Sequence, residues 1–141
     1  MLDDQTCLVT GSSRGIGRAV AEELGRHGAD VVVNYRSSAD EAEAVVDAIE
    51  DEGGTAIAVQ GNVADYDEVE AMCAEVHDTF GSVDVLVNNA GITVDKKFEN
   101  MTRADWQRVL DVNLGGVFNC THCLFDDIKS ADDGRLINIS S

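Results

Sequence analysis

Basic residues are scarce in this sequence. It contains 10 lysines and arginines against 27 aspartates and glutamates, so the formal net charge is -17 at pH 7. Nucleic-acid binding needs a basic face that contacts phosphates, and the scarcity therefore argues against a nucleic-acid partner. The acidic residues are dispersed along the chain rather than gathered in a tail. This usage is typical of a halophilic protein, whose self-repulsion is screened by salt, with an acidic mesophilic protein as the alternative.

Long apolar runs and an export signal are also missing. No segment approaches the roughly 18 consecutive apolar residues of a membrane span, and residues 1–4 lack the basic and apolar regions of a signal peptide. We therefore expect a cytoplasmic protein without a membrane partner. In that reducing compartment we expect free thiols, mostly buried because they lie in apolar stretches, at Cys7, Cys73, Cys120 and Cys123.

The last two of these cysteines have the C-x-x-C spacing of some metal and redox sites. The segment lies within a strong helical period, however, and has no second ligand pair downstream. We therefore interpret it as apolar packing with one exposed histidine, His122, and we expect no metal site.

The apolar residues that are present predict the fold. The chain has 141 residues, of which 44% are apolar, and this suits one domain with a hydrophobic core. Short apolar runs alternate with segments of helical periodicity, the pattern of βαβ units with buried parallel strands. The expected strands are residues 7–9, 31–33, 57–59, 85–87 and 136–139. Right-handed crossovers then give an α/β fold, a Rossmann-type doubly wound parallel sheet with strand order 3-2-1-4-5, whose ligand lies at the carboxyl ends of strands 1 and 4.

A glycine-rich loop follows the first expected strand and opens a helix. Its sequence, from Thr10 onward, reads T-G-S-S-R-G-I-G. Glycines permit a tight turn and let a pyrophosphate approach the backbone, while the helix N-terminus supplies amide donors and a favourable dipole. The succession of strand, loop and helix predicts a dinucleotide site. Its candidate residues are Gly11, Ser12, Ser13, Arg14, Gly15, Ile16 and Gly17.

This loop, together with the run N-N-A-G after the fourth expected strand, resembles the motifs of the short-chain dehydrogenase/reductase family. The resemblance implies that Asn89, Ala90 and Gly91 stabilise the central sheet and border the adenine ribose. It also implies that Asn62 and Val63, after the third strand, contact the adenine. For Asn62, a plain turn residue is the alternative.

The resemblance also implies catalytic residues. Asn113 matches the family's catalytic asparagine, whose backbone helps to hold a water, and Ser141 matches the serine that hydrogen-bonds the substrate carbonyl, with Ser140 as the weaker candidate. The family's proton donor is the tyrosine of a Tyr-x-x-x-Lys pair. The tyrosines here are Tyr35 and Tyr66, and neither has a lysine four residues later. We therefore expect the whole chain to be a truncated NADP(H)-binding domain, with its sheet incomplete on the C-terminal side and no carbonyl reductase activity of its own.

The residues after the second expected strand favour NADP(H) over NAD(H). NAD-binding domains place an acid about 20 residues beyond the glycine motif, where it binds the ribose 2'-hydroxyl. By family spacing Tyr35 takes that place here, with Arg36 next. An arginine pairs with a 2'-phosphate through a charge-assisted fork, whereas a carboxylate repels it. Arg14 resembles a second basic residue of NADP-preferring relatives, and Ser12 and Ser37 offer hydroxyl donors; solvated loop arginines are the alternative.

Within the family, the sequence looks most like the 3-oxoacyl-acyl-carrier-protein reductases. That likeness implies NADPH-dependent reduction of a 3-oxoacyl thioester to a 3-hydroxyacyl thioester, as in fatty-acid biosynthesis. Acetoacetyl-CoA reductase and sugar dehydrogenase remain open as alternatives, and so does a non-catalytic nucleotide-binding remnant. Complete family members form homodimers or homotetramers through the helix matching residues 114–128 and the helix after it. An assembly of residues 1–141 alone is expected to be weak, and its last strand to form an exposed, aggregation-prone edge.

Overall fold

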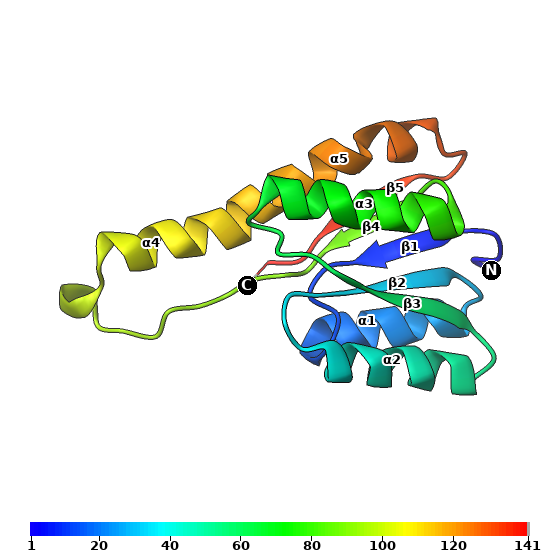
Figure 1. Ribbon diagram of the computed structural model, residues 1–141, viewed down its shortest axis with the longest axis horizontal. Coiled ribbons are helices and arrows are strands. Elements are labelled where there is room, and N and C mark those ends of the chain that lie inside the picture. Colours follow the sequence, from blue (N-terminus) through cyan, green and yellow to red (C-terminus); the bar gives the residue numbers. More distant parts are fainter. Residues whose placement is uncertain (141) are drawn as a thin grey trace.

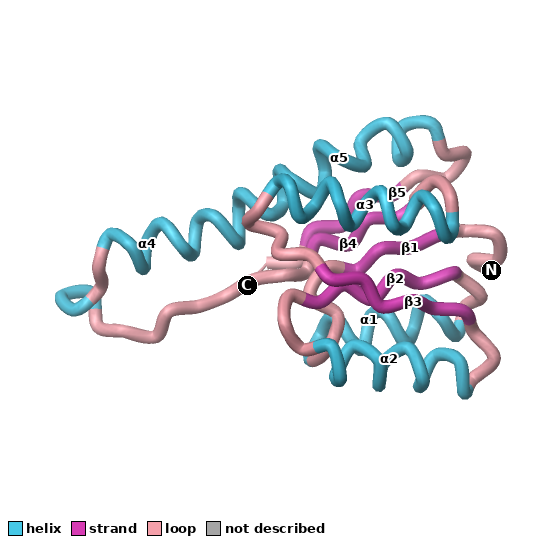
Figure 2. Tube along the Cα trace, viewed as in Figure 1, coloured by secondary structure: helices cyan, strands magenta, loops and turns pink. Residues whose placement is uncertain are grey.

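One five-stranded sheet, in the order β3-β2-β1-β4-β5, organises the computed structural model, which describes residues 1–140. Every neighbouring pair is parallel, and Figure 2 shows the strands side by side. The strands are β1 (Thr6–Val9), β2 (Asp30–Tyr35), β3 (Thr55–Gln60), β4 (Val85–Asn88) and β5 (Arg135–Asn138). The predicted Rossmann-type sheet and its strand order are confirmed.

Helices cover both faces of this sheet. On one face lie α1 (Gly15–Arg26) and α2 (Ala39–Asp51), and on the other lie α3 (Tyr66–Phe80) and α5 (Gly116–Ser130) (Figure 1). A short 3-10 helix, η1 (Phe98–Asn100), precedes α4 (Arg103–Leu110), which continues through a π-helical turn, η2 (Asp111–Gly115), into α5. Figure 1 shows α4 projecting beyond the sheet. Within residues 1–140, none of the helices combines the length and the hydropathy of a transmembrane segment.

The sheet packs a separate apolar cluster against each helical layer. Successive residues of a strand point to opposite faces, so Cys7 and Val9 pack with α1 and α2, whereas Leu8 packs with α3 and α5. All of β1 and β4 is buried. Because both faces of the sheet are covered, these strands read as continuous apolar runs in the sequence.

β5 differs from the other strands because all of its residues are exposed. Leu136 and Ile137 each keep 45% of their surface accessible. Within the described part of the chain only β4 pairs with this strand, so β5 forms the edge that the sequence predicted. Its unpaired side presents backbone groups that can pair with another chain.

The cysteines are free thiols, as predicted. Cys7, Cys73 and Cys120 are buried, and burial raises the pKa of each of these thiols to about 12. Cys123 is only half-buried, and His122 beside it on α5 is exposed. The C-x-x-C segment therefore packs Cys120 into the core, in agreement with its interpretation from the helical period.

We expect a maleimide at pH 8 to modify Cys123 rapidly and the three buried thiols only after urea is added. The thiolate is the nucleophile, and a pKa of about 12 leaves almost none of it at this pH. Mass mapping of the modified peptides measures the rates. A Cys123→Ser variant is the control and should stay unmodified until it unfolds. Rapid labelling of Cys7 or Cys120 in the native protein would contradict the packing.

Candidate functional site

Two cavities meet at the carboxyl edge of the sheet, and Ala90, Gly91 and Ile92 of the loop after β4 line both of them. The first cavity, of about 290 Å³, also takes residues from the loops after β1, β2 and β3 and from α4 and η2. The second cavity, of about 500 Å³, is bounded by α1, η2, α5 and the end of β5. Together they form a cleft at the predicted place, beyond the carboxyl ends of strands 1 and 4.

The glycine loop between β1 and α1 approaches the loop after β4 closely. Gly11 has a φ of +60°, and a Cβ there would lie 2.9 Å from the Cα of Ala90. At Gly17 a Cβ would collide with the side-chain amide of Asn89 and lie 2.5 Å from the carbonyl oxygen of Gly11. Gly11 therefore supplies a left-handed backbone that other residues avoid, and Gly17 lets the helix contact the neighbouring loop.

α1 begins between the two cavities, with Arg14 lining the first and Ile16 the second. Its N-cap, Arg14, makes no side-chain capping hydrogen bond, and its first turn contains no acid. By contrast, the side chain of Asp65 caps the N-terminus of α3, and a capping box that starts at Thr102 caps the N-terminus of α4. No partner exists within residues 1–140 for the amides of Gly15 and Ile16. Such amides carry the positive end of the helix dipole, so this terminus is suited to a phosphate group.

Asn34, near the end of β2, is only 1% exposed and connects two loops of the cleft. Its Oδ1 accepts the amide of Gly11 at 3.0 Å, and its Nδ2 donates to the carbonyl of Gly61 at 3.1 Å. One buried side chain thus joins the loop after β1 to the loop after β3. Asn34 was not among the residues that the sequence indicated, although a polar residue directly after three consecutive valines was an available signal.

Ser12 has a role that differs from the expected hydroxyl donor to a cofactor. It is fully buried, and its Oγ donates to the carbonyl of Val9 at 2.7 Å and accepts the amide of Asn34 at 3.1 Å. Its own amide donates to the carbonyl of Asn34 at 3.0 Å. The hydroxyl group and the backbone amide of Ser12 therefore both form hydrogen bonds that join β1 with β2. Ser13 and Ser37 do line the first cavity.

Thr10 ties the loop after β4 to the glycine loop. Its Oγ1 accepts the amide of Asn89 at 3.0 Å and that of Ala90 at 2.9 Å. In return, the Nδ2 of Asn89 donates to the carbonyls of Thr10 and Gly11, each at 3.1 Å. These contacts agree with the stabilising role that the family resemblance implied for the N-N-A-G run.

Asn113 lies in the π-helical turn η2 and lines the second cavity with Ser140. Its Oδ1 accepts the amide of Ile92 at 2.9 Å, and its Nδ2 donates to the carbonyl of Ile92 at 3.0 Å. The favoured candidate serine, Ser141, lies outside the described residues. π-helical turns are frequent at functional sites, and the sequence did not reveal this one.

Asn62 and Val63 line the first cavity. The Oδ1 of Asn62 accepts the amide of Ala64 at 3.0 Å, which forms an Asx turn. An amide oxygen has two lone pairs, so one of them and the Nδ2 donors stay available to a ligand. The turn and the ligand-binding interpretations of Asn62 are therefore compatible.

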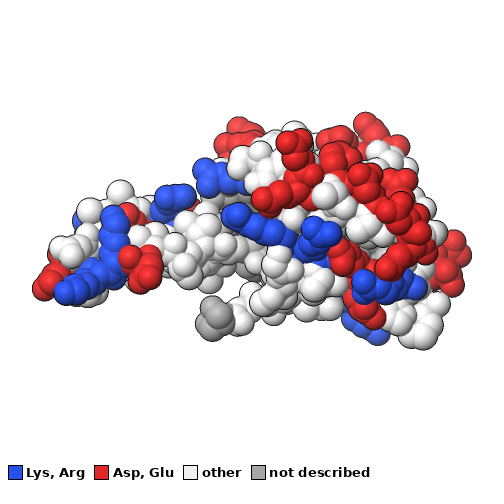
Figure 3. Space-filling view, turned by 90° about the horizontal axis from the view of Figure 1, so that it is seen from below, with Lys and Arg blue, Asp and Glu red and all other residues white. Residues whose placement is uncertain are grey.

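Three arginines line the first cavity: Arg14 and Arg36, which the sequence indicated, and Arg108 of α4, which it did not. Tyr35 lies beside Arg36 in the same lining, and no acidic residue of the described chain contributes to it. On the face shown in Figure 3, basic side chains gather over the middle and toward α4, whereas acidic side chains crowd the opposite end. The first cavity is thus a basic site on a strongly acidic protein.

Residues 5–141 match the family described as short chain dehydrogenase, and the chain belongs to this family. It is 50% identical over 137 residues to the 3-oxoacyl-[acyl-carrier-protein] reductase FabG of Staphylococcus aureus. It is 51% identical over 140 residues to the 3-oxoacyl-[acyl-carrier-protein] reductase of Synechocystis. These alignments cover 97% and 99% of this chain but 56% and 57% of the relatives, so the chain spans little more than half of their length.

Solved structures show the same fold. A short-chain dehydrogenase/reductase mutant from Serratia marcescens superimposes with a TM-score of 0.93 at 36% identity. A short chain dehydrogenase from Burkholderia cenocepacia in complex with NADP gives a TM-score of 0.93 at 38% identity. Each comparison covers 99% of this chain and 56% of the other protein. The family resemblance inferred from the motifs is therefore confirmed.

Replacing Gly17 with alanine should destabilise the protein by about 1–3 kcal/mol, because the added methyl group meets the Gly11 carbonyl and Asn89 in a packed site. Urea unfolding followed by circular dichroism measures the change. Gly115→Ala is the matched control: this glycine has a helical φ of -59°, and the nearest atom to an added Cβ is 3.7 Å away. A Gly17→Ala variant as stable as Gly115→Ala would show that the close approach is not required.

Proposed function

We propose that this chain is the NADP(H)-binding part of an enzyme that reduces a 3-oxoacyl thioester to a 3-hydroxyacyl thioester. The observation that carries the proposal is the first cavity, where Tyr35 and Arg36 take the place of the acid that binds the ribose of NAD. The relatives support it, because two of them are named as 3-oxoacyl-[acyl-carrier-protein] reductases and one solved neighbour is a complex with NADP.

The described residues fit a dinucleotide that extends across both cavities. Arg14 and Arg36 would hold the phosphate-bearing adenosine end in the first cavity, beside Asn62. The uncapped N-terminus of α1 would hold the pyrophosphate, and Gly17 lets this end of the helix lie against the loop after β4. The nicotinamide end then falls in the second cavity, near Asn113. When bound, the cofactor supplies the hydride.

The chain's own polar residues would position the substrate. Asn113 fixes Ile92 in the wall of the second cavity, and the hydroxyl of Ser140 or Ser141 would hydrogen-bond the substrate carbonyl. The proton donor that the family resemblance implies is a tyrosine within Tyr-x-x-x-Lys, and the 141 residues contain no such pair. We therefore expect these residues alone to bind the cofactor without reducing a carbonyl, because general acid catalysis supplies roughly 10²–10⁴-fold.

We also propose that the complete enzyme is a homodimer or homotetramer that assembles through the α5 side. Leu114, Phe118 and Phe125 on η2 and α5 are 66%, 62% and 54% exposed. With Leu136 of β5 they line an open groove of about 630 Å³. A continuous apolar surface of this kind is typical of a face that another protein surface covers.

Arg36→Asp should weaken NADPH binding by roughly tenfold or more and leave NADH binding nearly unchanged, because the new carboxylate repels the 2'-phosphate that only NADPH carries. Isothermal titration calorimetry with the chain measures both values of Kd. Arg103→Asp is the control, since it makes the same charge change on α4 outside both cavities. Equal losses for the two cofactors would refute the assignment to NADP(H).

A further inference from the structure

Of the three arginines that line the first cavity, Arg108 is the one that a helix supplies. Arg14 and Arg36 belong to the loops after β1 and β2, whereas Arg108 is on α4. Arg36 and Arg108 also both line an adjoining cavity of about 390 Å³, between the loop after β3 and α4. The two side chains therefore border the same space from opposite elements.

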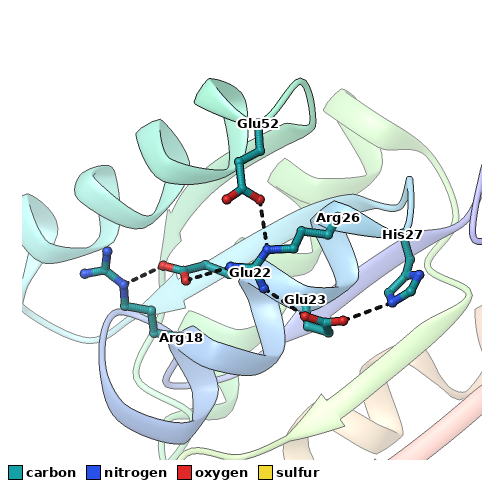
Figure 4. Close-up of polar contacts among 6 residues, drawn as sticks. All are labelled: Arg18, Glu22, Glu23, Arg26, His27 and Glu52. Atoms are coloured by element: carbon teal, nitrogen blue, oxygen red, sulfur yellow. Dashed lines mark hydrogen bonds and ion pairs between the residues drawn. The ribbon is translucent and has the colours of Figure 1, made fainter.

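The arginines of this cavity lack the carboxylate partners that Arg18, Arg26 and Arg135 have. Figure 4 shows Arg18 paired with Glu22, and Arg26 paired with Glu23 of α1 and with Glu52, the residue that follows α2. Arg135 pairs with Asp133. Within residues 1–140, no ion pair involves Arg14, Arg36, Arg103 or Arg108, and three of these four line the first cavity. In a chain with 27 acidic residues, the absence of a carboxylate partner for all three arginines of the cavity is consistent with a site that binds an anion.

Two carboxylates that border the cavity linings, Asp111 and Glu68, are engaged by other groups. Asp111 lines the adjoining cavity, and its Oδ1 accepts a hydrogen bond from Gln107 at 2.8 Å. Glu68 accepts from the side chain of Gln60 at 2.9 Å and from the amide of Asn62 at 3.2 Å. Neither acid lines the first cavity. An anion that enters the cavity therefore meets arginines and no carboxylate of the described lining.

The wall around Arg108 also suits a flat apolar group. Val112, four residues further along the same helical stretch, lines both cavities and is 9% exposed. Val63, which is 6% exposed, lines the first cavity as well. A cavity with two buried valines and a set of arginines matches a ligand that carries an aromatic base and a phosphate.

We propose that Arg108 is a further cofactor-binding residue, which contacts the 2'-phosphate of the adenosine end from the side opposite Arg36. The inference rests on the proposed function, since it takes the first cavity as the adenosine site. Arginine is suited to the task because its planar fork binds phosphate oxygens through charge-assisted hydrogen bonds. Ligand binding would then connect α4, which projects from the sheet, to the loop after β2.

Calorimetric titration with adenosine 2',5'-bisphosphate and with adenosine 5'-monophosphate tests the proposal, because the two probes differ by the 2'-phosphate. Arg108→Gln should weaken binding of the bisphosphate by about five- to tenfold and change binding of the monophosphate little. Arg103→Gln removes the same charge from the same helix outside the cavity and should bind both probes like the parent chain. Arg108→Lys keeps the charge without the planar fork and should bind the bisphosphate more tightly than Arg108→Gln.

Distinct outcomes separate this proposal from the proposed function. Equal affinities of Arg108→Gln and Arg103→Gln for the bisphosphate would overturn the role of Arg108 and leave the adenosine site intact. The same loss for both probes, or the same loss in Arg108→Lys as in Arg108→Gln, would overturn the assignment of its charge to the 2'-phosphate. Failure of the folded parent chain to bind either probe would instead contradict the proposed function itself.

Discussion

The cleft depends on buried and partly buried hydrogen bonds between loops that are far apart in the sequence. Asn34 joins the loops after β1 and β3, and Thr10 with Asn89 joins the loops after β1 and β4. Each such bond contributes only about 1 kcal/mol net, but leaving one buried partner unsatisfied costs about 1–3 kcal/mol. No buried side-chain polar atom of the described residues lacks a partner. These bonds fix the loops that carry the unpaired amides at the N-terminus of α1 and the arginines of the first cavity.

The charge of the protein and the charge of its site have opposite signs. A net charge of -17 repels a phosphate at long range, but charges more than about 10 Å apart are largely screened at 0.1 M salt. The electrostatic potential at a bound phosphate would therefore be set mainly by the first cavity, which Arg14, Arg36 and Arg108 line. The acidic residues lie elsewhere, and several of them pair with arginines of α1, as Figure 4 shows.

The sequence predicted the features that depend on local pattern. Buried strands produced apolar runs, and the spacing of the glycine loop fixed its place between β1 and α1. The order of the strands and the position of the cleft followed from these two patterns.

The sequence did not predict the features that depend on tertiary contacts. Ser12 was expected at the ligand, yet its hydroxyl joins β1 to β2. Arg108 reaches the cleft because the C-terminal part of α4 and the loop after β3 border the same cavity, and an amphipathic pattern does not specify that placement.

The most direct test of the account is a nuclear magnetic resonance titration of the isotope-labelled chain with NADPH. A cofactor that lies on the N-terminus of α1 and beside β2 should shift the amide resonances of Gly15, Ile16 and Arg36 as NADPH is added. The amides of Gly53 and Gly54, in the turn after α2, should stay unchanged. Shifts confined to the apolar groove of α5, or no shifts in the folded protein, would contradict it.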